Sequence, residues 1–499
     1  MKSDTLAVDD EQRTIAAYRE FLAAAPQAPQ RPEAMRRLGD LEMDGADRRL
    51  ADGAEPDYKA AIARYEDYLR NFPNSPGNDR VLYQLARAHE QGGALEVALK
   101  TLTQLVQQHP GTAYADEAQF RRGELLFATR QYAAAEAAYA TVLNSAPRPA
   151  LPAAPRGETG KVAEPHLPIS GQATPYQERA LYMQGWSLFK LGRLDDALQP
   201  FFGVLDAKLG TPGVELSRAD RELVDDTFRV TSIALANLQG AASIAPLVGG
   251  NGTRLVYEHQ VYEQLGELYL RQERIKDAAD TFAAFARQRP LHAKAPVLLS
   301  RVIATYESTG FATLALDAKR DYVARYGVAS EFRRANPEGW QQAQPLVKAH
   351  LTELARHHHA LAQKSKSAAD VQEAVRWYRL WLASFPTDTA TPQNHFLLAE
   401  LLSDDKRPAE AAVEFEQVAY GYEQHPRAAD AGYSALLSYA AQPATTELQR
   451  SAVASALRFA ERFGDDARAG SVLSNAAEQL FALRDADAAA ATAKRALAT

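Results

Sequence analysis

Residues 61–73 read Ala-Ile-Ala-Arg-Tyr-Glu-Asp-Tyr-Leu-Arg-Asn-Phe-Pro, and this pattern decides the fold because it recurs elsewhere in the chain with the same spacing. Tyr65, Tyr68 and Phe72 are three and four residues apart, so they lie on one face of a helix, and Pro73 cannot continue the helical hydrogen bonds. The same arrangement recurs in residues 15–26 and 375–386. One such helix cannot bury its apolar face alone, so the repetition predicts stacked helices.

Each proline-ended helix follows another helix, and the two carry small residues that allow close packing. In residues 79–110, Ala86 and Ala98 are twelve positions apart. The same pair of positions holds Gly123 with Ala135, Gly185 with Ala197, and Gly266 with Ala278. Weaker copies follow in residues 299–327, 395–423 and 477–497, and a long helix is expected around residues 345–364. The chain is therefore expected to be all-α and built from helix hairpins.

The composition narrows the possible classes of protein. Hydrophobic residues make up 46% of the 499 residues, enough for a continuous core, and the absence of cysteine excludes disulfides and thiolate chemistry. A net charge of -7 disfavours a protein that binds nucleic acid. The start of the chain lacks the apolar region of a signal peptide, and we expect that a targeting segment or membrane anchor was removed by truncation.

The interruptions of the repeat suggest an organisation in four parts. These are N-terminal repeats in residues 1–147, a Pro/Ala-rich flexible insertion in residues 148–175, middle repeats in residues 176–330, and C-terminal repeats in residues 331–499 that are expected to be truncated. A smaller insertion is expected at residues 44–56. Within the middle part, residues 216–255 are expected to form an atypical helical hairpin, with Ser217 as a helix cap.

The spacing of small and aromatic positions resembles the tetratricopeptide repeat, in which Leu-Gly-x-x-Tyr on the first helix is followed by Ala, Phe and Pro on the second. Residues 265–269 read Leu-Gly-Glu-Leu-Tyr. The resemblance implies a right-handed α-solenoid of stacked helix-turn-helix repeats. It also implies that exposed positions of the first helices line a concave groove that holds peptides.

Mapped onto this chain, the groove positions of three successive units hold aromatic and basic residues, which suit peptide anchoring. The predicted groove residues are Arg80, Tyr83, Arg87, Phe120, Arg121, Phe127, Tyr182, Trp186, Phe189 and Lys190. The alternative is that these rings pack against the neighbouring unit as core. We expect Trp186→Ala with Phe189→Ala to abolish partner capture at a nearly unchanged melting temperature, whereas loss of folding would mean that the rings are core.

The chaperone-binding branch of this family grips a C-terminal carboxylate with Lys and Asn, and that clamp is missing here. The corresponding positions hold Tyr83 with Arg87, Phe120 with Glu124, Tyr182 with Trp186, and Glu263 with Glu267. A chaperone tail is therefore not the expected ligand.

Segments such as Tyr-Leu-Arg-Asn-Phe-Pro-Asn-Ser-Pro at residues 68–76 are similar to segments of tetratricopeptide proteins of the bacterial envelope. These proteins include outer-membrane assembly lipoproteins and the periplasmic Tol-Pal coordinator. The resemblance implies a non-enzymatic scaffold that binds proteins or peptides in the periplasm. It also implies that any association with the membrane would occur only through a missing N-terminal anchor. The alternatives are an accessory subunit or domain of an envelope polysaccharide or peptidoglycan enzyme system, and a cytoplasmic location.

Two motifs in the sequence resemble a phosphate-binding loop and a metal site. Residues 156–161 are too short for a phosphate loop and are followed by Val162 where Ser or Thr would bind magnesium. His357, His358 and His359 are consecutive, so at most two could share a metal ion, with Glu353 one turn earlier. A metal-dependent activity at these histidines is the weaker hypothesis, and the sequence predicts no enzyme, no cofactor and no metal.

Overall fold

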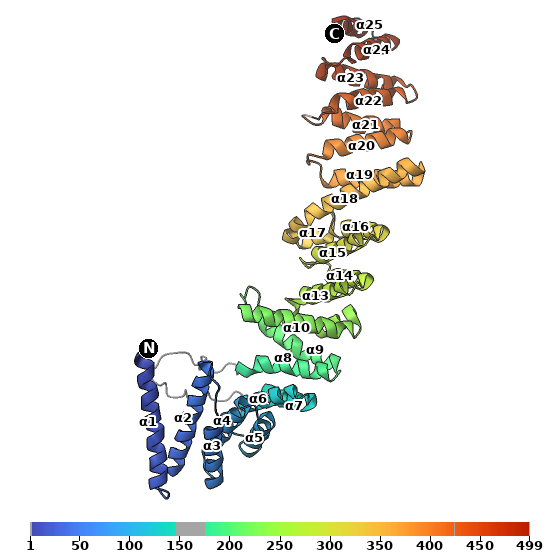
Figure 1. Cartoon of the computed structure of the whole chain (residues 1–499). Helices are drawn as coiled ribbons and strands as arrows, with labels where there is room; N and C mark the ends of the chain where they lie inside the picture. The colour runs from blue at the N-terminus through green and yellow to red at the C-terminus, as the bar shows by residue number, and fades with distance from the viewer. Residues whose placement is uncertain (1, 146–174, 424, 499) are drawn as a thin grey trace. The chain divides into compact units, whose positions relative to one another are not determined.

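A computed structural model describes residues 2–145, 175–423 and 425–498 of the chain (Figure 1). The described residues form helices and no strands. They divide into two compact units, residues 1–268 and residues 269–499, and the boundary falls within helix α13. The predicted flexible insertion lies outside the described residues, except for Pro175, which begins helix α8.

The helices of the first unit follow one another along the chain, with residues 146–174 between α7 and α8 outside the described part. They are α1 Lys2–Ala24, α2 Arg31–Ala51, α3 Lys59–Asn71, α4 Asn78–Gln91, α5 Leu95–Gln108, α6 Ala115–Ala128, α7 Tyr132–Leu143, α8 Pro175–Lys190, α9 Leu194–Leu209, α10 Arg218–Ala236, η1 Gly240–Ser243, α11 Ile244–Val248, α12 Gly252–Leu255 and α13 Glu258–Arg271.

The second unit continues with the same kind of helix. Its helices are α14 Ile275–Gln288, α15 Ala295–Ser308, α16 Ala312–Tyr326, α17 Glu331–Ala335, α18 Pro337–Ser365, α19 Ala368–Ser384, α20 Thr391–Asp404, α21 Pro408–Tyr420, α22 Ala428–Ala440, α23 Thr446–Arg462, α24 Ala469–Ala482 and α25 Ala486–Ala498.

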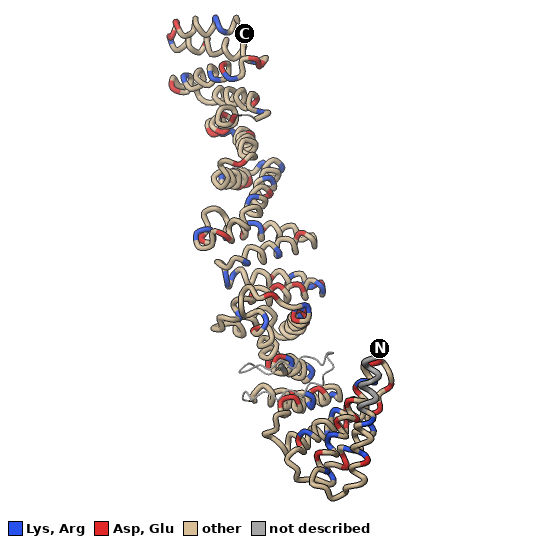
Figure 2. Tube along the Cα trace, turned by 90° about the vertical axis from the view of Figure 1, so that its left-hand side faces the viewer, with Lys and Arg blue, Asp and Glu red and all other residues tan. Residues whose placement is uncertain are grey.

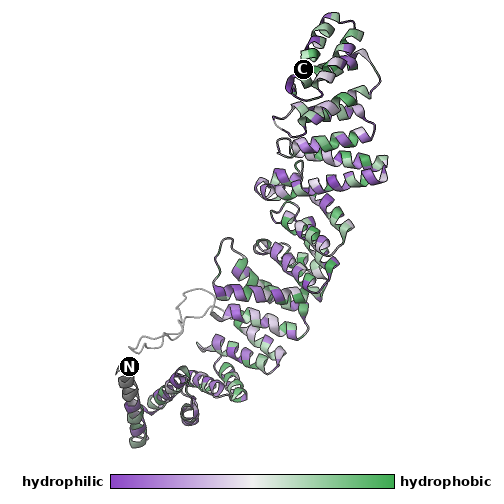
Figure 3. Cartoon of the chain, turned by 45° about the horizontal axis from the view of Figure 1, so that its top comes forward, coloured by the Kyte–Doolittle hydropathy of each residue, from purple (hydrophilic) through white to green (hydrophobic). Residues whose placement is uncertain are grey.

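The stretch that predicted the repeat is α3, the second helix of a hairpin with α2. Tyr65 and Tyr68 are buried, and the helix ends at Asn71; the N–H of the next residue, Phe72, donates to the carbonyl of Tyr68, and Pro73 follows. Apolar and polar residues are both found along the helices, as Figure 3 shows. Within each unit, helices that follow one another in the sequence pack side by side. Each unit is therefore an α-solenoid of stacked helix-turn-helix repeats, which confirms the predicted fold class.

Glycines on first helices let aromatic rings of second helices approach the backbone. A Cβ on Gly123 would lie 2.6 Å from the ring of Tyr139, and a Cβ on Gly39 would lie 2.7 Å from the ring of Tyr65. Both rings are fully buried. The first helix therefore needs a small residue at this position, because the aromatic ring of the second helix packs directly against its backbone.

The predicted insertions have different outcomes. Residues 44–51 continue α2, where Met43 and Ala46 are buried in the core cluster shared with α3, so the first part of the insertion expected at residues 44–56 is helical. Ser217 caps α10 as predicted, since its Oγ accepts a hydrogen bond from the N–H of Asp220 at 3.1 Å. The segment after α10 is not a second regular helix but three short pieces, η1, α11 and α12.

The C-terminal hairpins lie where the weaker repeats predicted them, as α15 with α16, α20 with α21, and α24 with α25. The expected long helix is α18, which has 29 residues and contains Pro345 in its interior. Its start is fixed by the indole of Trp340, which donates to the carbonyl of Tyr326 at 3.0 Å.

Candidate functional site

The predicted groove residues lie on the first helices α4, α6 and α8, as expected, but they differ in exposure. Tyr83 and Phe120 are buried, and Lys190 is exposed. The other seven are half-buried, namely Arg80, Arg87, Arg121, Phe127, Tyr182, Trp186 and Phe189. The face is therefore less open than the sequence suggested, and a partner would meet mainly its arginines and the rings on α8.

The three predicted arginines form ion pairs between successive first helices. Each of them bonds to a carboxylate of the preceding first helix, and Arg179 extends the series. The pairs are Arg80 with Asp40 at 2.9 Å, Arg87 with Asp47 at 3.4 Å, Arg121 with Glu90 at 3.2 Å, and Arg179 with Glu124 at 3.2 Å. Figure 2 shows acidic and basic residues interleaved on these N-terminal helices. We call this series the ion-pair ladder; it connects α2, α4, α6 and α8.

The acidic members of the ladder were missed by sequence reasoning. The mapping of groove positions identified the basic and aromatic residues, but it gave no sign that Asp40, Asp47 and Glu90 face the next helix. Their separations from their arginines, from 31 to 40 residues, follow no single repeat length. Only the stacking of the hairpins brings these charges together.

Tyr83 has a structural role in this arrangement. Its hydroxyl donates to the carboxylate of Glu117, and its ring stacks on Tyr114 at a centroid distance of 4.7 Å. Burial, with the charge of Glu117, raises the pKa of the Tyr83 phenol well above its usual value. Glu117 also accepts from Arg121 at 3.2 Å, so the tyrosine completes a buried network next to the ladder.

Phe120 and Phe127 pack against rings of their own hairpin, and Phe120 also packs against a ring of α8. Phe120 lies 5.8 Å from the ring of Tyr139 and 5.5 Å from that of Tyr176. Phe127 meets Tyr132 edge to face at 5.2 Å. For Phe120 the structure therefore favours the alternative that was left open, a ring that serves as core.

Three half-buried rings lie on α8, next to the exposed Lys190. Tyr182, Trp186 and Phe189 pack against a buried cluster that includes Phe201, and Trp186 meets Phe201 edge to face at 6.3 Å. Lys190 Nζ lies 5.5 Å and the Arg229 guanidinium 5.9 Å from the centroid of the Trp186 ring. Trp186 is thus a half-buried aromatic ring flanked by two cations.

Tyr182 is held at the edge of this cluster by α10. Its hydroxyl donates to Asp226, which is also paired with Arg229. Burial and the hydrogen bond to Asp226 raise the pKa of Tyr182 to about 12, so the phenol stays protonated at neutral pH. The segment from 216 to 236 therefore supports the α8 rings, a role that its sequence did not indicate.

The three consecutive histidines point to separate partners. His357 is exposed, whereas His358 and His359 are buried. His358 Nε2 is 3.0 Å from Arg320 Nη2, and His359 Nδ1 is 2.9 Å from the hydroxyl of Tyr378. Burial lowers the pKa of both buried rings. Among the residues that the structure describes, no three side chains are grouped as metal ligands, and Glu353 pairs with Lys319 instead.

Two further features bear on function. Within the described part of the chain, no single helix has the length and apolar character to span a membrane; only α10 taken with residues 240–248 passes such a test, and that pair is bent by 109°. Residues 156–161, which are too short to match a phosphate loop, lie outside the described residues.

Comparisons with solved structures found 222 matching chains. The Naa15/Naa10 complex bound to HypK-THB matches with 13% identity and a TM-score of 0.29, covering 97% of this chain and 68% of that chain. A tetratricopeptide repeat protein from Parabacteroides merdae matches with 14% identity and a TM-score of 0.27, covering 63% and 98%. Yeast Tom70 matches with 14% identity and a TM-score of 0.22, covering 92% and 91%.

Comparisons at the level of sequence were more restricted. No curated protein matches the chain. Two family models do match, both described as tetratricopeptide repeat, one over residues 50–119 and the other over residues 179–202. The matches cover α3, α4, α5 and parts of α2, α6, α8 and α9, and they include Arg80, Arg87, Glu90 and Trp186. The chain therefore contains tetratricopeptide repeats within its α-solenoid.

Proposed function

We propose that this chain is a non-enzymatic scaffold that holds segments of partner proteins on the first helices α4, α6 and α8. The observation that carries the proposal is the half-buried Trp186 ring with Lys190 and Arg229 beside it. Tryptophan and arginine are enriched at the energetic centres of protein interfaces. The buried rings Tyr83 and Phe120 support this surface from below and take no direct part in binding.

The cations around Trp186 favour an acidic or carboxylate-bearing segment of the partner. The ladder supplies a rigid frame, because its arginines are already paired with carboxylates and lose little side-chain freedom when a partner arrives. The partner is therefore expected to break few of the ion pairs in the ladder. Most of its affinity is expected to come from contacts with α8.

Site-specific crosslinking tests this proposal. In the native organism, the full-length gene product would carry p-benzoylphenylalanine at position 190, and a matched control would carry it at position 100, an exposed lysine on the second helix α5. A discrete crosslinked protein at position 190 that is absent at position 100 is expected. Equal crosslinking at both positions, or none at either, would oppose a binding face on α8.

We also propose that the scaffold works in the bacterial envelope, in the periplasm and next to the outer membrane. The support is the similarity of the phrase at residues 68–76 to envelope proteins of this repeat type. Fractionation of the native organism would test it. Recovery of the full-length product in the cytoplasm would favour the alternative location.

A further inference from the structure

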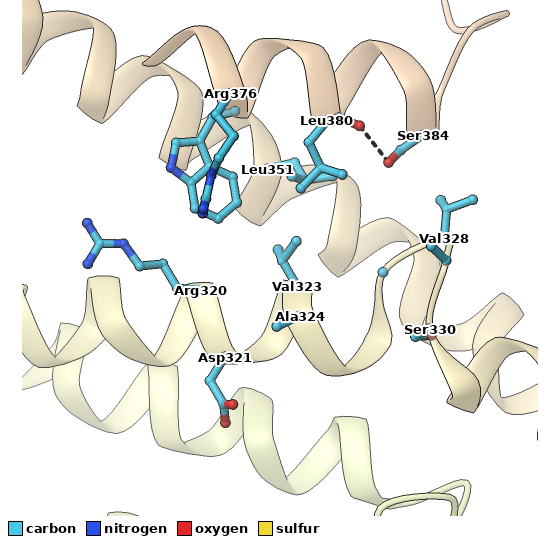
Figure 4. A pocket seen from close by; sticks show the side chains of 13 residues that line it. Arg320, Asp321, Val323, Ala324, Val328, Ser330, Leu351, Arg376, Leu380 and Ser384 are labelled. Atoms are coloured by element: carbon cyan, nitrogen blue, oxygen red, sulfur yellow. Dashed lines mark hydrogen bonds between the residues drawn. The ribbon is translucent and has the colours of Figure 1, made fainter. Parts of the chain in front are cut away.

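A pocket of about 520 Å³ lies in the C-terminal unit, between the second helices α16 and α19 (Figure 4). It arises where the repeat is irregular, because α17 and the start of α18 stand between α16 and the next hairpin. Phe332 of α17 packs on Tyr326 at 5.0 Å, and Trp340 donates to the Tyr326 carbonyl. The loop of residues 327–330 is thus fixed as one end of the pocket.

The lining is apolar in its centre. Val323, Leu351 and Trp377 are buried side chains of three different helices, and Leu380 at the rim is 39% exposed. The indole of Trp377 is held in place, since its Nε1 donates to Glu373 at 2.8 Å. A volume of this size falls in the range of pockets that take a ligand or a few side chains.

Two guanidinium groups, Arg320 of α16 and Arg376 of α19, lie at the end opposite to Val328 and Ser330 (Figure 4). Arg376 covers the Trp377 ring at 4.9 Å, and its side chain is 64% exposed. The one lining carboxylate, Asp321, does not offset them, because both of its oxygens accept from Arg325 at 2.8 Å.

The two arginines retain capacity for a further acceptor. Arg320 is 3.0 Å from Asp317 and 3.0 Å from His358, yet its buried Nε–H has no acceptor among the described residues. Among the described residues, the carboxylate paired with Arg376 is that of Glu373, at 3.4 Å, and it is shared with the Trp377 indole. A carboxylate placed between the two would make charge-assisted hydrogen bonds to both.

We propose that this pocket docks an extended segment of a partner protein that carries a large apolar residue close to an Asp or Glu. The apolar side chain lies over Leu380 and Val323, and the carboxylate lies between Arg320 and Arg376. This inference rests on the proposed scaffold function in one respect, because it takes the bound segment to belong to a partner protein. The site is on second helices of the other unit, so either proposal can fail alone.

Peptide selection on the full chain tests the proposal. Random 12-residue peptides displayed on phage would be selected on the purified protein, and the enriched peptides would be synthesised and their Kd measured by fluorescence polarisation. Enriched peptides are expected to contain a large apolar residue within two positions of Asp or Glu. Their affinity is expected to fall about tenfold or more on Arg320→Gln with Arg376→Gln, as for loss of a charged hydrogen-bond pair.

Matched variants and peptides sharpen the result. Arg379→Gln removes another exposed arginine of α19, which faces Glu410 and does not line the pocket, and it should leave Kd unchanged. Changing the peptide carboxylate to its amide should cause the same loss as the double variant, and the two losses should not add. Circular dichroism checks that each variant keeps its helices.

Three results would overturn the proposal. The first is enrichment of peptides without an acidic residue, and the second is unchanged affinity on Arg320→Gln with Arg376→Gln. The third is a dimer in sedimentation that Leu380→Ser dissociates, which would identify a second copy of the chain as the occupant. The crosslinking at position 190 is unaffected by each of these results, so the two proposals are separable.

Discussion

The ring of Phe201 on α9 lies directly against the backbone of Gly185 on α8, so close that a methyl group on the glycine would be 2.6 Å from Cε1 of the ring. No pair of carbon atoms packs at that distance, and Phe201 is fully buried. The hairpin of α4 and α5 uses a different solution at the same positions, with Ala86 and Leu102 buried in one cluster. The hairpin thus accepts either a glycine with a ring or an alanine with an aliphatic side chain.

We predict that Gly185→Ala lowers stability although alanine is the better helix former. The gain in helix propensity of about 1 kcal/mol is outweighed by overpacking, which costs roughly 1–3 kcal/mol when a buried ring cannot move. Adding Phe201→Leu should restore part of the lost melting temperature, as in the Ala86 hairpin. Gly111→Ala is the control, because a Cβ there meets nothing within 4 Å. A melting temperature for Gly185→Ala at or above that of the parent would contradict the prediction.

Removal of Asp40 is predicted to destabilise the N-terminal hairpins. Its carboxylate accepts from Tyr65 at 2.9 Å, Arg36 at 2.8 Å and Arg80 at 2.9 Å. Asp40→Ala removes this acceptor from all three donors, although Arg36 keeps its hydrogen bonds to Glu33. We expect a loss of about 1–3 kcal/mol in urea unfolding, the usual cost of stranding buried donors. Asp67→Ala, which removes an exposed pair with Arg70, should cost well under about 1 kcal/mol. Equal losses in the two variants would show that the ladder contributes little.

The stability of the C-terminal unit is predicted to fall as the pH drops below neutral. Burial lowers the pKa of His350, His358 and His359 in α18, so the unfolded chain takes up protons near pH 6.5 while the folded rings remain neutral. Their contribution is complete above about pH 6.5 and is lost as the pH falls toward the folded pKa values. The melting temperature at about pH 5.5 should therefore be lower than at about pH 7.5.

His359→Gln should flatten this dependence, because it removes a buried titrating ring and keeps a polar group for Tyr378. The matched change at the exposed neighbour, His357→Gln, should leave the slope as it is in the parent. If His359→Gln and His357→Gln altered the slope equally, burial of His359 would not be the cause.

The double variant Trp186→Ala with Phe189→Ala is now predicted to lower the melting temperature. Both rings pack against the buried Phe201 cluster, and truncating large core side chains costs roughly 3–5 kcal/mol each when fully buried and less when half-buried. Phe481→Ala is the control, since that ring is 72% exposed. An unchanged melting temperature would restore the sequence-based expectation that these rings are free for binding.

The binding role of the ten groove residues remains a prediction, but the structure separates them by what they touch. The resemblance to the tetratricopeptide repeat assigned them to first helices, which the structure shows as α4, α6 and α8, and spacing along one helix fixes the face on which a residue lies. Whether that face is open depends on the next hairpin. Tyr83 bonds to Glu117 of α6 and Phe120 meets Tyr176 of α8, and neither contact is encoded in spacing along α4 or α6 alone.

The sequence by itself determined the repeat unit of this protein: helices ended by proline, small residues on first helices, and rings on second helices that need those small residues. These are local properties, set by backbone geometry and by the size of side chains a few turns apart. The tertiary structure alone decided which charges pair in the ladder, where the irregular α17 and α18 open a pocket, and which aromatic rings stay accessible. Those features depend on distances between residues of different hairpins, which only the stacking of complete units sets.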